Sequence, residues 1–100
     1  MYLEVSAFNG RDDITKIQFN RDGQPVDFTA EGVTKIEAVA ASKVVPAEYT
    51  GNVVSVKFGK LGIMPGIYMA RIVIYTSTAP DGLVIAGPGK EVEIELSYNA

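Results

Sequence analysis

Polar and apolar residues alternate strictly along two runs in the second half of the chain, Pro65–Tyr75 and Glu91–Tyr98. In the first run one side carries Tyr68, Ala70, Ile72 and Ile74, and the other carries Met69, Arg71, Val73 and Tyr75. In the second run Val92, Ile94, Leu96 and Tyr98 lie opposite Glu91, Glu93, Glu95 and Ser97. A period of two with one apolar side is typical of a half-buried β-strand. Each run follows a Pro/Gly turn, so the pair predicts the closing strands of an antiparallel sandwich.

Further strands are predicted where short apolar runs lie between turn residues. These runs are Tyr2–Phe8, Ile14–Asn20, Pro25–Phe28, Val33–Ala40, Val53–Phe58 and Leu83–Ala86. Val33–Ala40 also has a helical interpretation because Ala and Glu favour helices, but its β-branched residues favour a strand. About seven to eight short strands punctuated by turns predict an all-β sandwich or barrel, with residues 1–100 as one domain.

The connections between these strands carry typical turn chemistry. Arg21–Gln24 predicts a hairpin turn because Gly23 accepts the positive φ that such turns demand. Ala41–Pro46 is an uncertain connection, Glu48–Asn52 is predicted to be a loop, and Gly59–Gly66 a crossover packed against the core. Thr76–Gly82 is polar and shows no periodicity, so it predicts a further loop.

Composition narrows the possible function. The 100 residues include no Cys, His or Trp, so a Cys–Trp–Cys immunoglobulin core and the commonest general base are both excluded. The net charge is −3 and the cations are scattered, which argues against nucleic-acid binding. No apolar run approaches the roughly 20 residues of a membrane span, and the N-terminal residues do not resemble a signal peptide.

Few side chains are arranged for chemistry. Asp12 and Asp13 are interpreted as a solvated turn, with a Ca²⁺ site as the weaker alternative because oxygen ligands must converge. Glu91, Glu93 and Glu95 are interpreted as a solvated strand face. We therefore expect no enzyme activity, no catalytic residue, no cofactor and no metal.

Three tyrosines are candidates for special roles. Tyr68 follows a Pro-Gly turn and is predicted to be a core or corner residue whose hydroxyl bonds back to that turn. Tyr49 and Tyr75 are candidates for exposed contact aromatics.

Three segments resemble small phage and prophage virion proteins that have an immunoglobulin-like sandwich, including the N-terminal domain of phage baseplate upper proteins. They are ITKIQFNRDGQPVDFT at 14–29, KLGIMPGIYMARIVIYTSTAPDG at 60–82 and VIAGPGKEVEIEL at 84–96; residues 42–52 have no counterpart. The resemblance implies an immunoglobulin-like antiparallel β-sandwich and a non-catalytic structural role in a tail, baseplate or neck. It also implies location in the virion, other virion proteins as partners and a possible homo-oligomer in the particle. The scattered cations and the short apolar runs predict neither nucleic acid nor membrane as partner.

The alternative function is a stand-alone module that binds carbohydrate or a cell surface, and an enzyme is a distant third. Aromatic side chains grouped in a shallow groove would favour the module, whereas a flat apolar patch or an open edge strand would favour assembly. Loops on a rigid scaffold commonly hold contacts. The leading candidate for a partner contact is therefore the predicted loop Thr76, Ser77, Thr78, Ala79, Pro80, Asp81 and Gly82.

Overall fold

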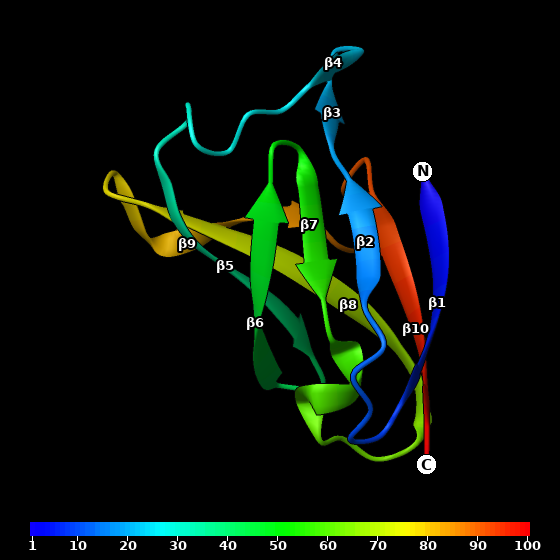
Figure 1. Ribbon diagram of the computed structural model, residues 1–100. Helices are drawn as coiled ribbons and strands as arrows, with labels where there is room; N and C mark the ends of the chain where they lie inside the picture. Colours follow the sequence, from blue (N-terminus) through cyan, green and yellow to red (C-terminus); the bar gives the residue numbers. More distant parts are fainter.

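The computed structural model describes residues 1–100 and contains ten β-strands and one short 3-10 helix, as Figure 1 shows. The strands are β1 (Tyr2–Phe8), β2 (Thr15–Gln18), β3 (Asn20–Arg21), β4 (Gln24–Pro25), β5 (Val33–Ala40), β6 (Lys43–Thr50), β7 (Val53–Val56), β8 (Gly66–Thr76), β9 (Ala79–Ala86) and β10 (Glu93–Asn99). The 3-10 helix η1 (Phe58–Leu61) follows β7. The all-β prediction is therefore confirmed, and the interpretation of Val33–Ala40 as a strand is correct.

Eight of the strands form one strongly curved sheet. Its order is β1-β10-β8-β5-β6-β7-β2, and β9 pairs with β8 off this path. β6 joins two parts of the sheet, because residues 43–47 pair with β5 and residues 48–50 pair with β7. In Figure 1, β2, β7 and β6 consequently lie in front of β5, β8 and β10. The sheet is nearly closed into a barrel, and β1 and β2 are the two ends that do not pair.

The core consists of 22 buried hydrophobic residues from both parts of the sheet. The alternation in the two diagnostic runs predicts its membership correctly: Ala70, Ile72, Ile74, Ile94 and Leu96 are all buried. A second group is aromatic, with Phe28 packed edge-on against Phe19 and Tyr49 at centroid distances of 5.9 and 5.6 Å. Every buried side-chain nitrogen and oxygen has a hydrogen-bond partner. Burial of these atoms therefore leaves no side-chain hydrogen bond unmade in the core.

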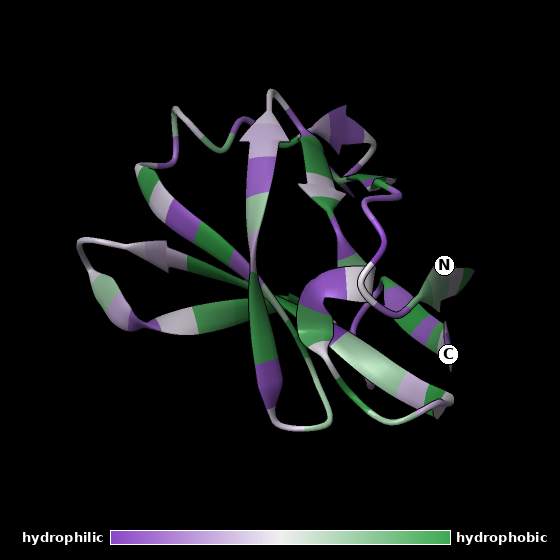
Figure 2. Ribbon diagram, turned by 60° about the horizontal axis from the view of Figure 1, so that its bottom comes forward, coloured by the Kyte–Doolittle hydropathy of each residue, from purple (hydrophilic) through white to green (hydrophobic).

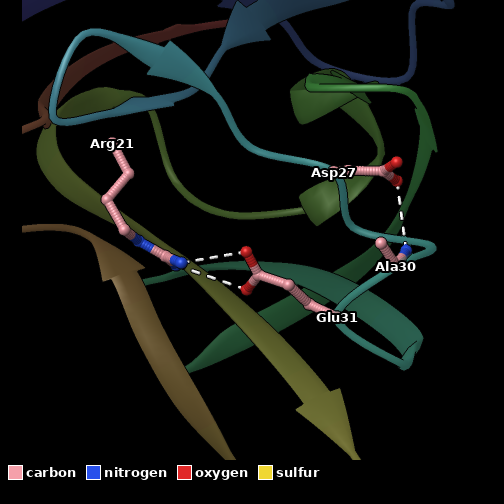
Figure 3. A network of polar contacts seen from close by, with 4 residues as sticks. All are labelled: Arg21, Asp27, Ala30 and Glu31. Carbon is pink, nitrogen blue, oxygen red and sulfur yellow. Dashed lines mark hydrogen bonds and ion pairs between the residues drawn. The ribbon is translucent and has the colours of Figure 1, made fainter.

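The segment between β4 and β5 is held by the polar contacts in Figure 3. The Asp27 carboxylate accepts a hydrogen bond of 3.1 Å from the backbone N–H of Ala30, and Arg21 contacts both carboxylate oxygens of Glu31 at 2.9 and 3.3 Å. The segment turns here and buries Phe28. The predicted strand Pro25–Phe28 is therefore wrong beyond Pro25, because Asp27 uses its side chain to form a turn.

Residues 43–50 contradict the sequence interpretation, which made them an uncertain connection followed by a loop. They form the strand β6. Ala41 and Ser42 make the turn before it with φ of +50° and +64°, a conformation that usually requires Gly or Asn. Pro46 is tolerated because this half of β6 pairs only with β5 and leaves its other side open.

The predicted loop Thr76–Gly82 is also wrong as a description of structure. β8 extends to Thr76 and β9 begins at Ala79, so only Ser77 and Thr78 form the turn. The Thr76 hydroxyl accepts a 3.1 Å hydrogen bond from the Ala79 N–H and closes that turn. The alternation is missing from the sequence because the pairing of β9 with β8 shifts register twice.

Candidate functional site

One face of the β1, β10 and β8 strands points away from the core. The pairing places Glu4 beside Glu95 and Glu95 beside Met69, and it places Ser6, Ser97 and Ile67 in the next row. Neighbours within a row lie on the same side of a sheet. We define the outer face as Tyr2, Glu4, Ser6, Phe8, Ile67, Met69, Glu93, Glu95 and Ser97.

Large apolar side chains on the outer face are unusually accessible. Ile67 is 71% exposed and Met69 37%, while Tyr2 and Phe8 mark the two ends of β1 with 51% and 46% exposed. Figure 2 shows the hydrophobic and hydrophilic bands that alternate along the strands beside both termini. Single exposed apolar residues are normal, whereas several on one face mark a surface suited to protein contact.

The outer face also carries carboxylates that form no ion pair. Glu4 lies directly opposite Glu95, and Glu93 follows on the same side of β10. The four ion pairs of the structure involve Glu31, Glu37 and Asp12 instead. The pKa of Tyr2 is raised by partial removal from water and by the carboxylates of Glu95, Glu4 and Glu93. The outer face is therefore acidic at β10 and β1, whereas β8 contributes Ile67 and Met69, followed on the same side by the exposed Arg71.

A shallow groove of about 590 Å³ lies on the other part of the sheet. It is lined by Ile14, Val44, Val45, Pro46, Glu48, Ser55, Lys57 and Lys60, and none of these residues is aromatic. Beside it, Asp12 forms ion pairs of 3.2 Å with Lys60 and 3.7 Å with Lys57. These contacts lower the pKa of Asp12, with the hydrogen bond from Lys60 as the largest cause. No three His, Cys, Asp or Glu side chains come together in the structure in a way that suits a metal ion.

The tyrosines are placed differently from what the sequence alone suggests. The Tyr68 hydroxyl donates to the Met64 carbonyl at 2.7 Å, as expected for a corner residue, although the side chain is only partly buried. Tyr98 is the buried tyrosine, with 1% exposed. Its hydroxyl lies 2.7 Å from the Gly59 carbonyl and 2.9 Å from Asn9 Oδ1. The sequence signal for the burial of Tyr98 is its position on the apolar side of the last predicted strand.

Neither candidate contact aromatic is free. Tyr49 packs against the core and donates to the Val33 carbonyl at 2.9 Å, so its interpretation as an exposed aromatic is wrong. Tyr75 donates to Glu37 at 2.7 Å, and the Lys35 ammonium lies 4.3 Å from its ring centroid. The hydrogen bond to Glu37 is the largest cause of a raised pKa for Tyr75.

The predicted contact segment and the outer face lie at opposite ends of β8. Thr76 ends the strand, whereas Ile67 and Met69 lie near its beginning. At about 3.3 Å per residue the two ends are separated by roughly 30 Å. The structure therefore does not bring Thr76, Ser77, Thr78, Ala79, Pro80, Asp81 and Gly82 together with the exposed apolar residues of the outer face.

No protein-family model, no curated protein and no solved structure matches this chain. Its only helix is the four-residue η1, and none is long and apolar enough to span a membrane. Interpretation of the surface therefore depends on the residues themselves.

Proposed function

We propose that this chain is a non-catalytic structural protein of a phage or prophage tail, baseplate or neck, and that it acts through protein–protein contacts. The resemblance of residues 14–29, 60–82 and 84–96 to small virion proteins supports the assignment to a phage or prophage particle. The observation that carries the contact function is the exposure of Ile67 and Met69 on β8, on the same sheet face as the exposed Tyr2 and Phe8 of β1. Burying such side chains against a partner stabilises a complex by about 25 cal/mol per Å² of apolar surface before the costs of association.

The proposed fold is an immunoglobulin-like sandwich. The strand order, the parallel pairing of β1 with β10 and the two-sided pairing of β6 support it. In such a sandwich the central strands of each part of the sheet pack face to face, and alternate residues fill the core. β8 and β10 show this pattern, which leaves their other face available for contact.

The carbohydrate-binding alternative receives less support. Sugar rings pack on exposed aromatic side chains, and the groove beside β6 and β7 contains none. Tyr49 and Tyr75 are occupied by hydrogen bonds within the domain. The accessible aromatics Tyr2 and Phe8 lie at opposite ends of β1 rather than together.

To test this proposal, a sequence that encodes an epitope tag is added to the gene in its own genome. Particles are then purified, and the tagged protein is detected in them. The double variant Ile67→Ser with Met69→Ser removes apolar surface from the outer face. Leu83→Ser is the matched control, because Leu83 is 51% exposed but lies on β9. We expect the parent and the control in particles and at least about tenfold less of the double variant, equivalent to about 1.4 kcal/mol.

Circular dichroism must show that both variants fold. Absence of the parent protein from particles would contradict the virion assignment. Normal incorporation of the double variant, together with loss of the Leu83→Ser protein, would move the contact to β9 and restore the region first predicted.

A further inference from the structure

The first strand leaves half of its backbone hydrogen-bonding groups without a partner strand. At its two ends the Glu93 N–H donates to the Met1 carbonyl and the Asn9 N–H donates to the Asn99 carbonyl, both at 2.8 Å. Peptide groups alternate sides along a strand, so the odd-numbered residues of β1 bond to β10. The N–H and C=O groups of Tyr2, Glu4 and Ser6 therefore point to the free edge.

The side chains at this edge are incompletely covered as well. Leu3 and Val5 face the core but are only partly buried, whereas their neighbours Ile94 and Leu96 on β10 are fully buried. The difference arises because β1 is the last strand and does not pair with β2. A strand added along β1 would pair the free backbone groups and cover Leu3 and Val5 at the same time.

The other free edges carry features that hinder such pairing, and the open side of the first half of β6 has Pro46. β9 contains Pro80 and Gly82 and shifts register twice against β8. β2 is four residues long and presents the exposed Lys16. β1 is seven residues long, pairs in unbroken register and contains neither Pro, Gly nor Lys. Short length, Pro, bulges and Lys are the usual ways in which proteins protect sheet edges, and β1 has none of them.

We propose that the free edge of β1 binds an extended segment of a partner protein that alternates Lys or Arg with apolar residues. The acidic residues of the outer face select this occupant, because Glu4 lies next to the added strand and Glu93 and Glu95 lie one strand further. A second copy of β1 in that place would add another Glu4 beside carboxylates that form no ion pair. This inference rests on the proposed assembly function only for the identity of the partner.

The probe is a capped nine-residue peptide in which lysine alternates with valine or threonine, and its counterpart has glutamate in place of every lysine. Binding is measured by calorimetry and by amide hydrogen exchange in the isolated protein. The lysine peptide should slow exchange at Tyr2, Glu4 and Ser6, whose N–H groups lack partners in the free protein. Because glutamate repels the carboxylates of the outer face where lysine pairs with them, the glutamate peptide should bind about tenfold more weakly than the lysine peptide.

Two charge variants complete the test. Glu4→Lys should remove the preference for the lysine peptide, whereas Asp81→Lys makes the same charge change on β9 and should leave the preference intact. Ser6→Pro removes only an unbonded N–H of β1 and should weaken the binding of the lysine peptide.

Equal binding of both peptides, or protection of β9 or β2 amides instead of β1 amides, would overturn the proposal. A dimer of the peptide-free protein that buries β1 would also overturn it, since a second copy would then be the occupant. Peptide binding by a protein that is missing from particles would refute the virion function and leave the edge proposal intact. Incorporation without peptide binding would refute the edge proposal alone.

Discussion

The two outer strands that flank β8 and β10 differ in how regular they are. β1 pairs with β10 in register over all seven of its residues. β9 has eight residues but pairs with β8 in fragments, because two register shifts interrupt the ladder. Pro80 and Gly82 lie in β9, and neither residue type occurs in β1. An edge strand therefore becomes available or unavailable for pairing through a few residues that interrupt the backbone, even where both strands have similar length.

The two edges also depend on different anchors. Tyr98 lies one residue before the end of β10, which pairs with β1, and its hydroxyl connects the sheet to Asn9, Gly59 and Gly62. β9 depends on close packing over Gly82, where an added Cβ would lie 2.5 Å from Val73 Cγ1 and 3.0 Å from a Tyr75 ring carbon. The β1 edge is therefore held by a buried aromatic side chain, whereas the β9 edge requires a residue without a side chain. Substitutions at these positions test the comparison directly.

The largest effect is expected at Tyr98. Tyr98→Ala should lower the free energy of unfolding by about 3–5 kcal/mol because it removes a fully buried aromatic ring. Tyr98→Phe should cost about 1–3 kcal/mol, since it leaves the Gly62 N–H without its acceptor and removes one of the two hydrogen bonds to the Gly59 carbonyl. Chemical denaturation measures both values. Tyr68→Phe is the comparison variant and should cost less, because the Tyr68 side chain is only partly buried.

An unchanged denaturation midpoint for Tyr98→Phe would show that its hydrogen bonds contribute nothing. A Tyr68→Phe protein less stable than Tyr98→Phe would restore Tyr68 as the principal tyrosine of the fold.

An intermediate effect is expected at Gly82. Its φ is +90°, so Gly82→Ala combines backbone strain with the clash against Val73 and should cost about 1–3 kcal/mol. Gly51→Ala is the matched control, because Gly51 also has a positive φ of +60° but an added Cβ would meet nothing within 4 Å. The difference between the two losses in denaturation measures the close packing of β9 on β8. Equal losses would show that strain alone operates at Gly82.

The smallest effect concerns the two outward tyrosines, Tyr2 on β1 and Tyr75 on β8. Both have a raised pKa, but partial removal from water is the largest cause for Tyr2, whereas for Tyr75 it is the hydrogen bond to Glu37. Glu37→Gln should therefore lower the pKa of Tyr75 toward its ordinary value and leave that of Tyr2 unchanged. Titration of each phenol by nuclear magnetic resonance measures the two values.

The sign of the linked stability change follows from the direction of the shift. A folded-state pKa above the unfolded value means that the neutral phenol is favoured by folding. Its contribution is fully present below the unfolded pKa near 10 and is lost as the pH rises through the folded pKa. The Glu37→Gln protein should therefore lose less stability than the parent over that alkaline range. A parallel loss in both proteins would contradict the role of Glu37.

The sequence predicts which side chains of the outer face point away from the core, but it does not predict that β1, β10 and β8 lie side by side. The alternation along Pro65–Tyr75 and Glu91–Tyr98 correctly separates the core side from the outward side, so the outward direction of Met69, Glu93 and Glu95 follows from it. The prediction that Thr76–Gly82 forms a loop is wrong, because polar residues with Pro and Gly also occur on a protected edge strand, whereas the contact role of this segment stays a prediction. Which strands become edges depends on pairings between distant residues, and these leave no local pattern.

The sequence by itself determined the period of its strands, the turn at Asp22-Gly23 and the identity of most core residues, because these depend on neighbours a few positions apart. Tertiary structure decided the strand at Lys43–Thr50, whose turn uses the non-glycine residues Ala41 and Ser42, and the burial of Tyr98 rather than Tyr68. It also decided that β1 pairs with β10 across nearly the whole chain and leaves one edge open. The physical reason is that the backbone hydrogen bonds between two strands are the same whatever side chains the strands carry. Which distant strands pair is therefore selected by the packing of the whole core.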